Sequence, residues 1–188
     1  MVRSMRRGQW RAIVLGLVFG LLAVGVGATP SLAATTSFNA TFTETTTPQA
    51  CPPGVPAGAF CYTGSGTGPT TPPVPTDLNG TENFAGFVDR AMGSPTTRCA
   101  PDFNIVSIRT YAGTLFLTTQ GSACPDPTDP TNPAKSVDNG TWRAFGGTGI
   151  FEGASGSGAV STTGTFVSPT KITSVSTYSG MLTLRGEN

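Results

Sequence analysis

Apolar and polar residues alternate along much of the chain, which is the period of a β-strand with one buried face. The clearest case is residues 37–44, where Phe38, Ala40 and Phe42 share one face while asparagine and threonine residues share the other. No window of a dozen residues after about position 34 carries an apolar stripe at helical spacing. The pattern therefore predicts an all-β protein.

Further strands are predicted by the same alternation. They cover residues 83–91, 103–111, 114–119, 141–147, 158–167 and 171–185, the last bent at Gly180. Residues 83–91 are also compatible with a helix fragment, and Ala112-Gly113 predicts a hairpin between 103–111 and 114–119. Seven to eight antiparallel strands without intervening helices are typical of a sandwich or a barrel. We expect a closed antiparallel β-barrel, because the last strand is too uninterrupted for an exposed edge and closure removes edges.

Two segments rich in proline and threonine interrupt this pattern, at residues 45–78 and 122–140. Their prolines lack backbone donors and their glycines loosen the chain, so we expect two long loops. A loop as long as the first is usually functional or disordered in a compact fold. It is interpreted either as a tolerated surface insertion or as a lid.

The first residues have the order of a secretory signal peptide. Four arginines precede an apolar run at residues 12–28, and small residues follow it. We predict a signal peptide at 1–33 with cleavage after Ala33, or after Ala34, and a single barrel domain at 34–188. An uncleaved anchor is the alternative, and the export route, general or twin-arginine, stays open. The expectation is a secreted protein with no stable membrane insertion after cleavage.

Composition excludes several kinds of chemistry. After the leader, seven basic and ten acidic residues remain, a net charge of −3 with no basic cluster, so nucleic acid is not an expected partner. The chain has no histidine, which excludes Ser-His-Asp and Cys-His catalysis and imidazole metal sites. We expect no cofactor and no metal. An acid or base has to be a carboxylate, tyrosine, lysine or cysteine, and Glu44 and Glu152 are the candidate catalytic carboxylates.

Four cysteines, an even number in an exported domain, indicate two disulfides among three possible pairings. We favour Cys51 with Cys61 and Cys99 with Cys124, because both pairs close short loops around proline-rich segments. A four-thiolate zinc site is the alternative, but the chain lacks the close Cys-x-x-Cys pairs that it needs.

The most patterned stretch is GGTGIFEGASGSG at residues 146–158. It lacks the lysine of a phosphate-binding loop, and Glu152 stands where a dinucleotide-binding fingerprint has its third glycine. The stretch is better explained as a place where β-strands bend, with its glycines permitting positive φ or a bulge. We expect Ile150 and Phe151 to plug one end of the core, and Glu152 to be satisfied by solvent, a basic side chain or backbone N–H groups.

GGTGIFEGASG, followed after one strand by VSPTK at residues 167–171, resembles the allene oxide cyclase barrel superfamily, whose fold is related to that of the dirigent proteins. The resemblance covers about 45 residues of the C-terminal half and implies a bacterial-type, secreted member with an eight-stranded antiparallel barrel and an apolar interior. Plant members cyclise a fatty-acid epoxide with a Glu-x-Asn pair on the first strand. This chain lacks that pair, and alignment on Glu44 places the two positions at Thr41 and Thr43.

Three functions remain open. The first is a non-catalytic barrel that binds a small apolar or lipid-like molecule, with a lining drawn from five aromatic candidates: Phe42, Phe116, Trp142, Phe151 and Tyr178. These aromatics could instead simply fill the core. The second is a cofactor-free isomerase or cyclase, which requires Glu44 or Glu152 to face the interior. The third is a structural or surface-interaction protein with a filled barrel and exposed, ordered loops. The oligomeric state is left open.

Overall fold

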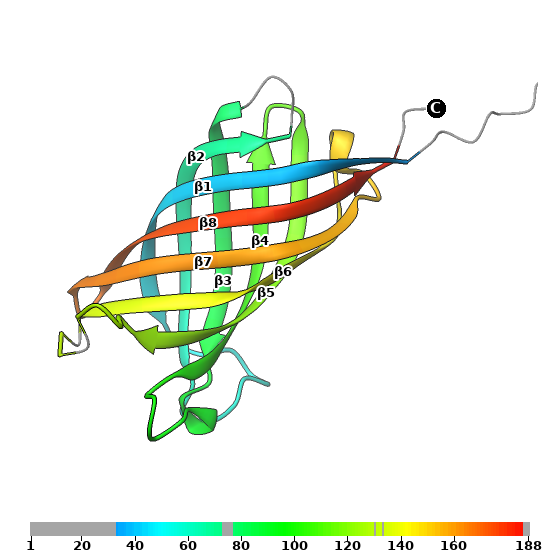
Figure 1. The fold of residues 1–188 in the computed structure, drawn as a ribbon. Coiled ribbons are helices and arrows are strands. Elements are labelled where there is room, and N and C mark those ends of the chain that lie inside the picture. The colour runs from blue at the N-terminus through cyan, green and yellow to red at the C-terminus, as the bar shows by residue number, and fades with distance from the viewer. Residues whose placement is uncertain (1–32, 73–76, 130, 133, 186–188) are drawn as a thin grey trace, which may run out of the picture. The chain divides into compact units, whose positions relative to one another are not determined.

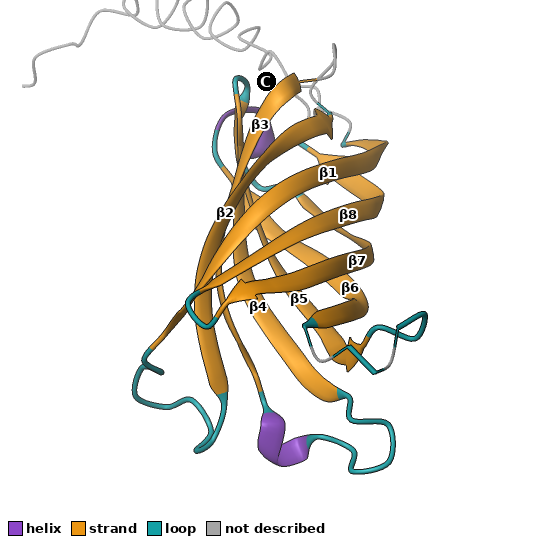
Figure 2. Ribbon diagram, turned by 90° about the vertical axis from the view of Figure 1, so that its left-hand side faces the viewer, coloured by secondary structure: helices purple, strands orange, loops and turns teal. Residues whose placement is uncertain are grey.

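The computed structural model describes residues 33–72, 77–129, 131–132 and 134–185, and the predicted signal peptide lies almost wholly outside these residues. Eight strands make up most of the described chain. They are β1 (Ala34–Gln49), β2 (Phe60–Thr71), β3 (Asp77–Val88), β4 (Ala100–Thr110), β5 (Gly113–Pro125), β6 (Lys135–Gly147), β7 (Ser155–Ser168) and β8 (Lys171–Leu184). Two single-turn 3-10 helices, η1 (Arg90–Met92) and η2 (Gly149–Phe151), lie at opposite ends of the barrel (Figure 2).

The strands form one closed antiparallel barrel in sequence order (Figure 1). Each strand pairs with the next, and β8 pairs with β1 from Ala34↔Leu184 to Thr46↔Ile172. This pairing leaves no free edge on either of the two terminal strands. The predicted closed barrel, the 103–111/114–119 hairpin and the late strand at 171–185 are thereby confirmed.

The prediction of a long loop at 45–78 is wrong. The segment contains the end of β1, all of β2 and the start of β3, and only residues 50–59 and 72–76 connect strands. Glycines take the inward positions in the middle of β2, namely Gly64, Gly66 and Gly68. The sequence of this strand therefore shows no alternation of apolar and polar side chains. A Cβ on Gly68 would lie 1.8 Å from the Thr41 carbonyl oxygen, because the neighbouring strand passes close by.

The second predicted loop, at 122–140, is also mostly strand. β5 continues to Pro125 and β6 begins at Lys135, with pairs from Ser122↔Asn139 to Pro125↔Ser136. Backbone hydrogen bonds hold these strand ends together without any alternation of apolar and polar side chains. The side-chain pattern therefore could not reveal the two strand ends. The connection is confined to residues 126–134.

The core fills one half of the barrel, toward η2. Its largest fully buried side chains are Phe38, Phe42, Trp142, Phe151, Ile108, Leu115, Leu117 and Leu182. The ring of Phe38 meets that of Trp142 edge-on at a centroid distance of 5.1 Å, and the indole N–H of Trp142 donates to the Ser179 carbonyl oxygen at 3.1 Å. Buried apolar side chains are therefore packed against one another in this half of the barrel.

The glycine-rich stretch bends the chain at that filled end. Gly146 has φ of +133° where the β5–β6 register shifts between Phe116 and Leu117, and Gly149 has φ of +61° at the start of η2. Both conformations favour glycine. The bend carries Phe151 into the core, where it is fully buried. The predictions of a β-bend and of an apolar plug are confirmed for Phe151, with Ile150 partly buried against the core.

Candidate functional site

The other half of the barrel, toward η1, holds a cavity of about 540 Å³. Its wall includes seven apolar side chains: Phe60, Phe84, Val88, Val106, Val160, Phe166 and Ile172. A volume of this size is typical of small-molecule sites, and here apolar side chains share the wall with many polar ones, among them four carboxyl groups and two tyrosines.

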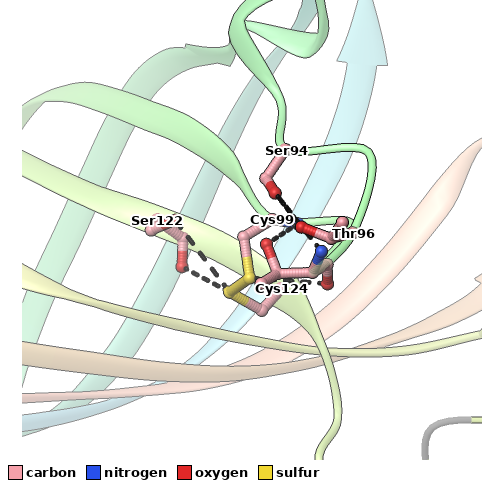
Figure 3. The surroundings of a disulfide bond; sticks show 6 residues. Ser94, Thr96, Cys99, Ser122 and Cys124 are labelled. Atoms are coloured by element: carbon pink, nitrogen blue, oxygen red, sulfur yellow. Dashed lines mark hydrogen bonds between the residues drawn. A yellow bond between two sulfur atoms is a disulfide. The ribbon is translucent and has the colours of Figure 1, made fainter.

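The mouth of the cavity is formed partly by the connection at residues 89–99. Asp89 caps η1 by accepting hydrogen bonds from the backbone N–H groups of Ala91 and Met92. Cys99, at the end of this connection, is bonded to Cys124 of β5 (Figure 3). The second disulfide joins Cys51 to Cys61, so both predicted pairings are confirmed. Covalent links thus hold two of the connections at the η1 end of the barrel.

Two carboxyl groups meet on the cavity side of Gly66. This glycine of β2 pairs with Glu44 of β1 on one side and with Glu82 of β3 on the other. A Cβ on Gly66 would lie 2.7 Å from Cγ of Glu44. The absence of a side chain on the middle strand therefore allows the two glutamates to approach, and both are buried.

Hydrogen bonds hold this pair in place. The Tyr178 hydroxyl donates to Oε1 of Glu82 at 2.5 Å, and the Ser174 hydroxyl donates to Oε2 of Glu44 at 2.7 Å. Oε2 of Glu82 accepts no hydrogen bond from the described donors. Burial, followed by the charge and hydrogen bonding of Glu44, raises the pKa of Glu82 well above its ordinary value, which favours its protonated form. Burial and the nearby Glu82 also raise the pKa of Tyr178.

A second carboxyl pair, Asp102 and Asp138, is arranged around another glycine. Gly121 of β5 pairs with Asp102, and a Cβ on Gly121 would lie 2.3 Å from Oδ1 of Asp138. Asp102 accepts hydrogen bonds from the Tyr62 hydroxyl at 2.5 Å and from Nδ2 of Asn104 at 2.9 Å. Burial, together with a hydrogen bond to Asp102 and its charge, raises the pKa of Asp138 to about 8.

The interior is acidic and its cations lie at the mouth. Among the described residues that line the cavity, the basic ones are Arg90 and Arg98 of the 89–99 connection and Lys135, the first residue of β6. The Arg90 guanidinium lies 4.7 Å from the centroid of the Phe60 ring, and Lys135 is paired with Asp129 at 3.2 Å. Three of the four interior carboxyl groups, Glu44, Glu82 and Asp102, therefore have serine, tyrosine or asparagine donors rather than paired cations.

Of the two candidate catalytic carboxylates, Glu44 lines the cavity. Glu152 is exposed beside η2, at the filled end of the barrel, so the structure does not bring the two together. The two positions aligned with the plant pair, Thr41 and Thr43, point outward from β1 and are exposed.

The five aromatic candidates occupy three different environments. Tyr178 lines the cavity. Phe42 packs edge-on against Tyr178 at a centroid distance of 6.2 Å and belongs, with Trp142 and Phe151, to the filled core. Phe116 does not line the interior as expected, because its neighbours Leu115 and Leu117 take the inward positions and its ring stacks on the exposed Phe145.

Sequence reasoning missed Tyr62, Glu82, Asp102 and Asp138. Tyr62 and Glu82 fall in or beside a segment interpreted as loop, and Asp138 falls in the other such segment. Asp102 and Asn104 continue the inward alternation of Val106 and Ile108, so a polar residue in phase with apolar ones was the available signal. Which acids would meet depended on strand register.

No protein-family model matches the chain, and no curated protein matches it. Within the residues that the structure describes, no helix is long and apolar enough to cross a membrane. The same residues contain no group of three or more histidine, cysteine or acidic side chains placed to hold a metal ion.

Proposed function

We propose that this protein is an exported barrel that binds a small, largely apolar molecule in the cavity at the η1 end. The observation that carries the proposal is the cavity of about 540 Å³ at the end of the barrel opposite the packed apolar core. Apolar side chains form the wall and buried acids and tyrosines form its polar patches, a distribution that suits a ligand with an apolar body and one polar end.

Membership of the allene oxide cyclase barrel superfamily is part of this proposal. The closed eight-stranded barrel is the architecture that the resemblance implies. GGTGIFEGASG forms the bend and plug at one end, and VSPTK forms the turn between β7 and β8 at the other. The outward positions of Thr41 and Thr43 argue that the chemistry of the plant enzymes does not carry over by that alignment.

Export is likewise proposed. The two disulfides are consistent with an extracellular protein, since such bonds persist in oxidising compartments. The signal peptide at 1–33 supplies the route in this proposal.

A cofactor-free isomerase or cyclase is the second candidate. The specific observation in its favour is the buried pair of Glu44 and Glu82 with the Tyr178 hydroxyl, which offers a proton donor and an acceptor inside the cavity. The third possibility, a purely structural protein, predicts a filled barrel, and the hollow half argues against it.

Binding can be tested with N-phenyl-1-naphthylamine, a neutral apolar probe whose emission rises in an apolar site. We expect saturable binding to the mature protein. Val160→Trp places an indole in the cavity and is expected to weaken binding by about tenfold or more, because it fills the space the probe needs. Val175→Trp is the matched control, since Val175 is exposed on the outer face of β8.

Two results would contradict the proposal. One is the absence of saturable emission with the wild-type protein. The other is equal loss of binding in the Val160 and Val175 variants while both remain folded by circular dichroism, because binding would then not depend on the cavity.

A further inference from the structure

We propose that the polar end of the ligand is an organic ammonium group, that it binds between Glu82 and Glu44, and that its entry displaces the proton that Glu82 carries. The inference rests on the proposed binding function and specifies the chemical class of the ligand. It concerns one site in the cavity, at the row formed by Glu44, Gly66 and Glu82.

The first argument is the unfilled hydrogen-bonding capacity of the pair. Tyr178 and Ser174 each donate to one oxygen of Glu82 and Glu44, respectively. Oε2 of Glu82 has no partner among the described residues, although Glu82 is fully buried and lines the cavity. An ammonium group carries three donors and no acceptor, so it matches an acceptor-only site.

The second argument is charge. The acids and tyrosines that line the cavity are Glu44 of β1, Tyr62 of β2, Glu82 of β3, Asp102 of β4, Asp138 of β6 and Tyr178 of β8, and β5 and β7 contribute none. The cations among the described lining residues, Arg90, Arg98 and Lys135, lie at the mouth. A bound carboxylate or phosphate near the glutamate pair would face like charges without a cation beside it, whereas an ammonium would supply the missing countercharge.

The third argument concerns the body of the ligand. Phe84 of β3 and Val160 of β7, which pairs with Tyr178, line the cavity around the polar row. Their apolar surfaces suit an alkyl or aromatic substituent on the nitrogen. A primary amine with an apolar chain therefore satisfies both the polar row and the wall.

The number of protons released on binding follows from the protonation state of Glu44 and Glu82 before the ligand enters. Two ionised carboxylates buried on either side of Gly66 would repel each other, so their adjacency favours a proton on one of them, and the raised pKa of Glu82 is consistent with that state. When an ammonium binds, the proton of Glu82 leaves to solvent and both carboxylates accept from the ligand. The O–H bond of the Glu82 carboxyl group breaks and the proton passes to water or a buffer base; no other covalent bond changes, and one positive charge replaces another.

The test compares three ligands of the same chain length, n-octylamine, 1-octanol and octanoate, by isothermal titration calorimetry at pH 6, 7 and 8. Octylamine, like a lysine side chain, stays protonated over this range. We expect it to bind at least about tenfold more tightly than octanol at pH 8, with an affinity that rises by up to about tenfold per pH unit, the limit for one released proton. Octanol affinity should change with pH much less than amine affinity, and octanoate should bind most weakly.

Proton release is measured directly by repeating the amine titration in two buffers of different ionisation enthalpy. We expect close to one proton released per amine bound at pH 7. Glu82→Gln should abolish this release and remove the advantage of amine over octanol, while octanol binding is retained. Glu44→Gln is expected to act in the same direction, and Glu152→Gln, which changes an exposed carboxyl group at the filled end, should leave all three ligands unaffected.

The wild-type comparison does not depend on whether the variants fold. Equal, pH-independent binding of amine and alcohol would overturn the ammonium site while leaving the proposed binding function intact. Tighter binding of octanoate than of octylamine would also overturn it. Failure of all three ligands, together with failure of N-phenyl-1-naphthylamine, would instead count against the binding function itself.

Discussion

Replacing Asp138 by asparagine should stabilise the protein at alkaline pH and much less at acidic pH. Asp138 has a pKa of about 8, against an ordinary value of 3.8, because burial and the neighbouring Asp102 disfavour its charged form. The folded protein therefore binds more protons than the unfolded chain between these two values, and its stability must fall as pH rises through that window. Asparagine has nearly the same shape and carries no charge to bury.

The size of the stability change follows from the pH range between the ordinary and the raised pKa of Asp138. Between pH 5 and pH 8 a single group with this pKa contributes at most about 4 kcal/mol, at about 1.4 kcal/mol per pH unit. Asp138 is only partly buried, so solvent reduces the effect to roughly 1–2 kcal/mol. Asp138→Asn is expected to be more stable than the wild type by that amount at pH 8, and by much less at pH 5.

The assay is urea unfolding of both proteins at the two pH values, with the disulfides intact. The quantity of interest is the stability difference between variant and wild type at pH 8 minus the same difference at pH 5. Titrating groups that do not interact with Asp138, Glu82 included, cancel in it. Glu152→Gln serves as the control for loss of an exposed carboxyl group. A variant whose stability relative to the wild type is the same at both pH values would refute the reasoning.

The remaining predictions concern the filled end, the glycine row and a disulfide. Phe151→Ala should lower the free energy of unfolding by about 3–5 kcal/mol, because it empties a fully buried site, yet leave probe binding at the other end unchanged in the folded fraction. Gly66→Ala should destabilise by about 1–3 kcal/mol, since its Cβ would meet Glu44 at 2.7 Å; unfolding curves no different from the wild type would contradict the close approach. Replacing Cys99 and Cys124 together by serine should lower stability by about 3 kcal/mol for a 25-residue separation, measured by thermal unfolding against the oxidised wild type.

The all-β fold class of this protein is determined by the alternation of apolar and polar residues within each strand. Alternation in residues 37–44 places Phe38 and Phe42 on one face whatever the partner strand is, and the structure buries both. The glycine-rich bend and the cysteine pairing are local in the same sense, because turn conformation and short loop closure act over few residues. These features could be predicted from the sequence.

Strand recognition failed where inward positions carry no apolar side chain. β2 presents Gly64, Gly66 and Gly68 to the interior, and it is a strand because it pairs with β1 and β3. A glycine-rich segment between prolines has the local appearance of a loop. Only the backbone hydrogen bonds of its two neighbours make it a strand.

The candidate site depended on tertiary structure more than the fold did. Glu44 and Glu82 are 38 positions apart, and they meet because barrel closure and strand register place Gly66 between them. Register also separates Glu44 from Glu152, which look alike as isolated acids in the sequence. Alternation along one strand determines which side chains face inward, but it carries no information about which strand lies beside it. The sequence alone therefore determined that Glu44 faces inward, and the tertiary structure decided that its partner is Glu82.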